Sequence, residues 1–241
     1  MENKIRKNLL SLWGQREVKD GEYHVTELNR CLRKSYYERK DGLTSAPNGY
    51  MLNGTLLHKE LPNLLNEIDK FKDAKYEVPV IDNTVNGLKI VGSADVLTAD
   101  TVYDLKYSGS HFEKSIPEHY VMQLNTYAGI MNIKRCGIIH INSTTLQVSV
   151  VEFDYDPRMY ELAKNRAMIL HYALKVGVSP PGPAFDWECK YRKVYCDYKD
   201  KCKELMIGFD GCGLEKTLKG FMEEKEWIKY IMEEWHKTIN D

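Results

Sequence analysis

Two short charged segments constrain the fold of this chain more than any other feature. They are Gly92-Ser93-Ala94-Asp95 and, nine residues later, Asp104-Leu105-Lys106. Each follows an apolar run, so the charges should lie at the ends of buried strands. The turn residues Thr98-Ala99-Asp100 between them predict a hairpin, in which Asp95 lies beside Asp104.

This hairpin would bring together the groups that phosphodiester cleavage needs. Residues two apart on a strand share a face, so Asp104 and Lys106 should point the same way. Two neighbouring carboxylates are unfavourable unless a cation neutralises them, which favours Mg²⁺ or Mn²⁺. Such a cation activates water, and Lys106 would position that water and offset the charge of the phosphate. The alternative is an exposed cross-strand ion pair, which the same pattern also forms.

Two further motifs accompany the hairpin. His58 lies on a leucine-rich predicted helix upstream of both aspartates, where its imidazole would be a ligand of a second metal ion. Gln123 and Tyr127 are four residues apart on another predicted helix, and hence on one face of it. Together they would hold a phosphate or the lysine in place. Taken alone, each motif has a simpler explanation: a core or surface histidine, and a polar helix stripe.

The pattern of apolar residues and turns predicts an α/β fold, with a mixed central sheet that carries the chemistry and helices that cover it. Strands are expected at 76–81, 88–97, 101–107, 136–141 and 147–153. Helices are expected at 1–20, 27–39 with Thr26 as N-cap, 55–72, 116–132, 157–175 and 214–239.

The cysteines indicate a second kind of site. The chain has six of them, no apolar run long enough to span a membrane, and no recognisable signal sequence. We therefore expect a cytoplasmic protein whose thiols are ligands or buried groups rather than disulfides. Cys31, Cys189, Cys196 and Cys202 are placed to close a metal cluster, whereas Cys136 lies in an apolar strand. Four thiolates bind zinc or an iron–sulfur cluster, and the ligand set alone does not decide between them.

The ordered set of these motifs resembles the RecB-like nucleases of the PD-(D/E)XK superfamily. With cysteines at both ends, the chain looks like a CRISPR-associated Cas-four exonuclease, and it is also similar to the nuclease domains of AddB and the Dna-two helicase-nucleases. The resemblance covers roughly residues 23–205, between an N-terminal helix at 1–22 and a C-terminal helical extension at 206–241. It implies a restriction-endonuclease-like core with an added Cys-rich iron–sulfur subdomain.

The resemblance also implies roles for particular residues. The ligands of the catalytic metal would be His58, Asp95, Asp104 and the carbonyl of Leu105. The catalytic lysine would be Lys106, and the motif peculiar to RecB-like nucleases would be Gln123 with Tyr127. The ligands of a 4Fe-4S cluster would be Cys31, Cys189, Cys196 and Cys202, with Zn²⁺ as the alternative occupant. The family's spacing of the later cysteines requires an insertion at Arg192–Tyr195, and Cys212 is a competing ligand.

DNA is the expected partner. The net charge is −1, so nucleic-acid contact has to come from local patches. Basic, tyrosine-rich segments surround Cys31 and the later cysteines, and a cluster would unite them into a surface suited to single strands or DNA ends. An amphipathic stripe between residues 218 and 239 leaves two alternatives for the C-terminal helix, packing on its own domain or association with a partner or a second copy.

The expected function is therefore a metal-dependent DNA exonuclease, and whether it also cuts as an endonuclease is left open. The resemblance implies that the protein processes DNA for CRISPR spacer acquisition, with the Cas integrase as its partner. A virus- or plasmid-encoded recombination or repair nuclease with the same chemistry is one alternative. Another is a DNA-binding or complex-assembly module with zinc in the cysteine site.

Overall fold

The computed structural model describes residues 2–11, 18–42, 49–109, 116–180, 190–191 and 194–202. The chain forms two compact units, each built from separate stretches of sequence. The first comprises Met1–Val18, Ala46–Ile81 and Val91–Pro157, and the second Lys19–Ser45, Asp82–Ile90 and Arg158–Asp241. The division at 1–22, 23–205 and 206–241 stays a prediction.

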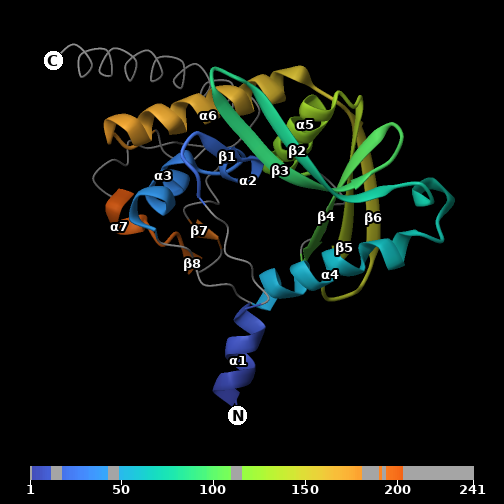
Figure 1. Ribbon diagram of the computed structural model, residues 1–241. Helices are drawn as coiled ribbons and strands as arrows, with labels where there is room; N and C mark the ends of the chain where they lie inside the picture. Colours follow the sequence, from blue (N-terminus) through green and yellow to red (C-terminus); the bar gives the residue numbers. More distant parts are fainter. Residues whose placement is uncertain are drawn as a thin grey trace. The chain divides into compact units, whose positions relative to one another are not determined.

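The first unit is built on a mixed sheet, as the apolar pattern predicts (Figure 1). Its strands are β2 (Lys75–Val85, as far as Ile81), β3 (Leu88–Leu97, from Val91), β4 (Thr101–Ser108), β5 (Arg135–Asn142) and β6 (Val148–Asp154). β4 pairs antiparallel with β3 and parallel with β5, and β6 pairs antiparallel with β5. The parallel pair needs a long connection, which contains helix α5 (Glu118–Met131).

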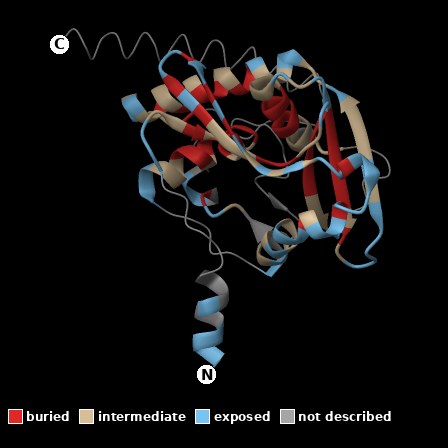
Figure 2. Cartoon of the chain, turned by 45° about the vertical axis from the view of Figure 1, so that its right-hand side comes forward, coloured by how far each residue is buried: buried red, intermediate tan, exposed pale blue. Residues whose placement is uncertain are grey.

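The alternation of side chains along β4 divides the core from the polar site. Tyr103 and Leu105 are almost fully buried and pack with Leu61 of helix α4 (Gly49–Leu65) and Phe71 of the 3₁₀ helix η1 (Asp69–Phe71). Because successive strand residues point to opposite faces, Asp104 and Lys106 lie on the other face of β4. Figure 2 shows the buried character of β4 and β5.

The ring of Tyr103 requires a glycine on the neighbouring strand. Gly137 lies opposite Tyr103 in the β4–β5 register. A Cβ atom at residue 137 would lie 2.3 Å from Cδ1 of that ring, so any larger residue would push the tyrosine out of the core.

The second unit consists of short elements around one long helix. They are β1 (Glu22–His24), α2 (Val25–Leu28), α3 (Leu32–Asp41), α6 (Pro157–Val176, from Arg158), β7 (Lys190–Tyr191), β8 (Val194–Tyr195) and α7 (Lys199–Cys202). Next to β1, the carbonyl of Gly21 accepts the Lys89 N–H at the start of β3 at 2.7 Å. Helix α1 (Glu2–Ser11) belongs to the first unit.

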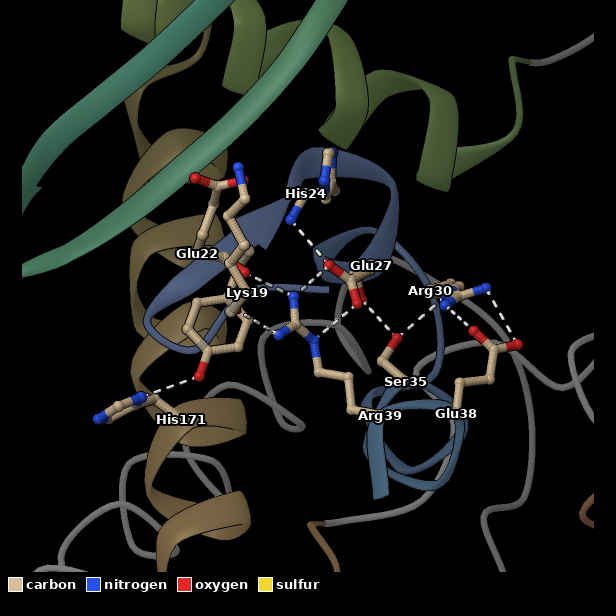
Figure 3. A network of polar contacts seen from close by, with 10 residues as sticks. Lys19, Glu22, His24, Glu27, Arg30, Ser35, Glu38, Arg39 and His171 are labelled. Atoms are coloured by element: carbon tan, nitrogen blue, oxygen red, sulfur yellow. Dashed lines mark hydrogen bonds and ion pairs between the residues drawn. The ribbon is translucent and has the colours of Figure 1, made fainter. Parts of the chain in front are cut away.

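A buried ion pair lies at the centre of the polar network in this unit (Figure 3). Arg39 contacts both carboxylate oxygens of Glu27 at 2.8 Å, and both side chains are almost fully buried. The same guanidinium donates to the carbonyls of Lys19 and Glu22 and lies 4.4 Å from the ring centre of Tyr23. Each nitrogen of this buried guanidinium therefore has a hydrogen-bond partner, and the Tyr23 ring lies against it.

The stability of this unit should depend on pH through Glu27. Burial acts to raise the pKa of Glu27, but the hydrogen bonds and charge of Arg39 outweigh it and hold the pKa below its usual value of 4.5. A carboxyl with a lower pKa in the folded state stabilises the fold above its unfolded pKa, and this contribution is lost as the pH falls through the folded pKa. We expect the wild type to lose more free energy of unfolding than Glu27→Gln below about pH 4.5. Parallel losses in urea titrations at stepped pH would contradict this.

The strands at 76–81, 88–97, 101–107, 136–141 and 147–153 appear as β2 to β6, but the helix predicted at 27–39 is interrupted after Leu28. The chain forms α2 and α3 instead, and His24 rather than Thr26 precedes the first of them. Glu27 accepts the His24 N–H at 2.8 Å and so begins α2 early. Arg166 of α6 donates to the carbonyls of Leu28 and Arg30, which a continuous helix would use internally.

Two other helices end elsewhere than predicted. The helix expected at 55–72 is α4, which ends at Leu65 because η1 then turns Phe71 into the core. The helix expected at 1–20 does not reach its predicted end, since residues 18–21 lead into β1 without helical structure. The helix expected at 214–239 lies outside the described residues. Within the described part of the chain, none of the helices combines the length and apolar character that a membrane span requires.

Candidate active site

The hairpin of β3 and β4 places the first two carboxylates. Val96 lies opposite Tyr103, so the next residues along the ladder are Asp95 and Asp104. Asp95 Oδ2 accepts the backbone N–H of Leu105 at 2.6 Å, which holds this carboxylate in one orientation. Its other oxygen, Oδ1, lies 3.3 Å from Nδ1 of His58 on α4.

The side chain of Gln123 on α5 holds the second half of the site. Its Nε2 donates to Asp104 Oδ1 at 3.0 Å, and its Oε1 accepts from Lys106 Nζ at 3.1 Å. Lys106 Nζ also lies 2.5 Å from Asp104 Oδ2 as an ion pair. The hydroxyl of Tyr127 lies 3.4 Å from Gln123 Nε2, so one amide links Tyr127, Asp104 and Lys106.

Burial and neighbouring charges together shift the pKa values of Asp104, His58 and Lys106. Burial raises the pKa of Asp104; the Lys106 ammonium opposes this rise and the Asp95 carboxylate adds to it. Burial acts to lower the pKa of His58, but the hydrogen bond and charge of Asp95 outweigh it, and the pKa of His58 is raised. For Lys106 the opposing charge of Asp104 outweighs burial in the same way, and its pKa is raised. The raised pKa values of His58 and Lys106 follow from the negative charge of the neighbouring carboxylates, whereas that of Asp104 follows first from its burial.

The donor set fits a divalent metal ion. Asp104 Oδ2 is buried and accepts no well-directed hydrogen bond, although Lys106 lies beside it. Carboxylates with one imidazole are ligands that Mn²⁺ accepts, and Mg²⁺ accepts the oxygens. The residues that would hold such an ion are Asp95 and Asp104, with His58 beside Asp95; His58 and the Leu105 carbonyl as further ligands of it stay predictions.

Tyr120 belongs to the site, and sequence reasoning missed it. Its ring centre lies 4.4 Å from Lys106 Nζ, so the lysine is stacked on an aromatic face as well as bonded to Gln123. The spacing of Tyr120, Gln123 and Tyr127 was the available signal, because residues three and seven apart share a helix face.

Glu77 of β2 is the second residue that sequence reasoning missed. One ligand atom from each of His58, Glu77 and Asp95 lies within 4.8 Å of the other two. No sequence signal marks this glutamate, because it lies in an alternating strand where exposed charged residues are ordinary.

The expected cysteine cluster is only partly within the described residues. Cys31 is buried and precedes α3, and Cys196 is partly buried; both belong to the second unit. The ring of Tyr198 stacks on Tyr37 of α3 at 5.4 Å, so the chain after Cys196 packs against the helix that begins beside Cys31. Cys189, Cys212 and the side chain of Cys202 lie outside the described residues, and the cluster stays a prediction.

The expected basic surface around Cys31 carries carboxylates as well. Arg30 and Lys34 pair with Glu38, and Lys201 lies 2.5 Å from Asp41. These pairs neutralise part of the positive charge on which DNA binding would depend. Binding of DNA there stays a prediction.

Two solved structures share this fold. The crystal structure of SSO0001 aligns with a TM-score of 0.63 and 24% identity, covering 84% of this chain and 96% of that one. The crystal structure of an alkaline exonuclease, LHK-Exo from Laribacter hongkongensis, aligns with a TM-score of 0.51 and 12% identity, covering 71% and 93%. The chain thus has a mixed α/β fold in common with an alkaline exonuclease. No protein-family model and no curated protein matches the sequence.

Proposed function

We propose that this protein is a metal-dependent deoxyribonuclease that hydrolyses phosphodiester bonds, acting as an exonuclease at DNA ends. One observation carries the proposal: Asp95, Asp104 and Lys106 converge in the first unit, with His58 beside one carboxylate and Gln123 bonded to the other. The fold in common with an alkaline exonuclease supports it.

Each residue has a distinct task in this mechanism. A bound divalent cation would act as a Lewis acid and lower the pKa of a water molecule. Asp95 and Asp104 would hold the cation, and His58 lies beside Asp95 on α4. Lys106, held by Gln123 and the Tyr120 ring, presents its ammonium to the attacking water and the phosphate. The Leu105 N–H keeps the Asp95 carboxylate from rotating.

A cleavage assay tests the proposal. Linear single-stranded DNA, blunt duplex and circular single-stranded DNA would each be incubated with Mn²⁺, Mg²⁺ or EDTA. We expect loss of linear single strands with either metal, slower loss of duplex, and no cleavage in EDTA. Cleavage of the circle would add endonuclease activity. A wild-type protein that cuts no substrate with either metal would overturn the proposal, and the DNA-binding module would then be favoured.

The Tyr120 ring should contribute measurably to cleavage. A cation on an aromatic face is stabilised by about 0.5–2 kcal/mol. Without the ring, the Lys106 ammonium should spend less time in its active position, and cleavage should slow about tenfold. We expect this loss in Tyr120→Leu, while Tyr120→Phe keeps most of the rate because it retains the ring. Single-turnover rates at several pH values would measure both variants. Equal rates in the two variants would show that the ring is not used.

A 4Fe-4S cluster bound by Cys31, Cys189, Cys196 and Cys202 is part of the proposal. The packing of Tyr198 on α3 supports it, because it brings the chain after Cys196 to the helix that begins beside Cys31. Iron and sulfide content, with the visible absorption of anaerobically purified protein, would measure it. Zinc in place of iron would contradict the iron–sulfur assignment and support the alternative occupant.

In a CRISPR setting, the nuclease would trim DNA ends for new spacers beside the Cas integrase. The same chemistry serves recombination or repair of viral or plasmid DNA. Co-purification with an integrase would favour the first role. Both roles use the same metal-dependent hydrolysis of phosphodiester bonds.

A further inference from the structure

Three side chains beside the hairpin form a second group of metal ligands. Nδ1 of His58 lies 3.3 Å from Asp95 Oδ1 and 3.8 Å from Glu77 Oε1, and the three ligand atoms lie within 4.8 Å of one another. A six-coordinate cation with bonds of about 2.1 Å places neighbouring ligand atoms about 3.0 Å apart and opposite ones about 4.2 Å apart. The two distances from His58 fall within this range, and the ligand atoms of Glu77 and Asp95, within 4.8 Å of each other, would reach it by a small movement of the exposed Glu77 side chain.

Both carboxylates of this group are held by their other oxygen. Asp95 Oδ2 accepts the Leu105 N–H at 2.6 Å, and Glu77 Oε2 accepts the hydroxyl of Ser93 at 2.9 Å. Each carboxylate therefore presents one oxygen to His58, while its second oxygen stays bonded to the Leu105 N–H or to the Ser93 hydroxyl. Ligands held by such outer contacts are the usual construction of a metal site.

The backbone of Glu77 has an unusual conformation, and its side chain is exposed. Its φ is +48°, which is uncommon for a residue other than glycine and departs from the regular strand. Glu77 is also 57% exposed, so a cation held there would keep coordination positions for water or a phosphate oxygen.

The Asp104 carboxylate is engaged separately. One of its oxygens accepts from Gln123 and the other lies beside Lys106. We propose that His58, Glu77 and Asp95 form a second divalent-cation subsite, which shares Asp95 with the subsite of Asp104. The inference rests on the proposed nuclease function, in which paired cations stabilise both the attacking and the leaving oxygen.

Titration of the metal-free protein with Mn²⁺ alone, followed by calorimetry and electron paramagnetic resonance, tests this subsite without DNA. We expect two Mn²⁺ per wild-type chain and magnetic coupling between them through Asp95. Glu77→Gln should bind one Mn²⁺ without coupling. Ser93→Ala should keep both ions but bind the second about tenfold more weakly, because the support of Glu77 is lost.

Glu60→Gln is the matched control, since Glu60 is an exposed glutamate on the same helix as His58 and bonds only to Asn63 among the contacts described. It should bind two ions. A single Mn²⁺ in the wild type, or unchanged stoichiometry and affinity in Glu77→Gln, would overturn the subsite. A wild type that binds two coupled ions but cuts no DNA would instead refute the nuclease proposal and leave the subsite standing.

Discussion

Replacing Asp104 with asparagine should lower the rate of DNA cleavage about a thousandfold. Charge stabilisation by a bound metal supplies several kcal/mol to such a reaction, and each 1.36 kcal/mol is a factor of about ten in rate. The amide keeps the shape of the side chain, and its oxygen still accepts from Gln123 Nε2. It removes the charge that Oδ2 offers to a cation and to Lys106. The rate with Mn²⁺ on a labelled single strand measures the loss.

Two further variants separate the loss of cleavage in Asp104→Asn from damage to the fold. Lys106→Ala should be similarly inactive but retain Mn²⁺ binding, because the lysine is not a ligand. Asp73→Asn changes an exposed aspartate and should cut like the wild type. Far-UV circular dichroism checks that all three variants fold. Equal residual cutting in Asp104→Asn, Lys106→Ala and the wild type would indicate a contaminating nuclease and contradict the assignment.

Replacing Arg39 with alanine should destabilise the second unit by about 3–5 kcal/mol, because it leaves the Glu27 carboxylate buried without its partner. Both members of this pair are almost fully buried, with 5% and 7% of their side chains exposed. The substitution also removes donors to the carbonyls of Lys19 and Glu22 (Figure 3). The free energy of unfolding from urea titration followed by circular dichroism measures the effect.

The matched control is Arg135→Ala in the first unit. Arg135 pairs with Glu152 at 3.2 Å, but 48% of its side chain is exposed, so the expected loss is below about 1 kcal/mol. The double variant Glu27→Gln with Arg39→Met should recover part of the loss, since no charge is then buried alone. An Arg39→Ala protein as stable as the Arg135→Ala protein would contradict the central place of this pair.

Local sequence predicted the strands better than the helices. The strand at 88–97 agrees residue for residue with β3, because turn residues bound it on both sides. The helix expected at 27–39 is divided in two because Arg166, more than a hundred residues away, takes the carbonyls of Leu28 and Arg30. No pattern within residues 27–39 contains that information.

The candidate site, too, has parts that the local sequence predicted and parts that it did not. The proximity of Asp95, Asp104 and Lys106 follows from one hairpin and the two-residue period of a strand, both of which are local. Gln123 and Tyr127 required the helical period and the resemblance to RecB-like nucleases. Tyr120 was within reach of the same helical spacing. Glu77 was out of reach, since its positive φ and its hydrogen bond with Ser93 of the neighbouring strand have no signal in the local sequence.

The sequence by itself determined the mixed α/β fold and the pairing of the two aspartates with a lysine, because alternation and turns act over a few residues. Only the tertiary structure decided which groups surround them: the Gln123 amide between Asp104 and Lys106, the Tyr120 ring beside the lysine, and Glu77 near His58. These contacts join separate strands and helices. Their geometry comes from the packing of whole elements, which no single segment encodes.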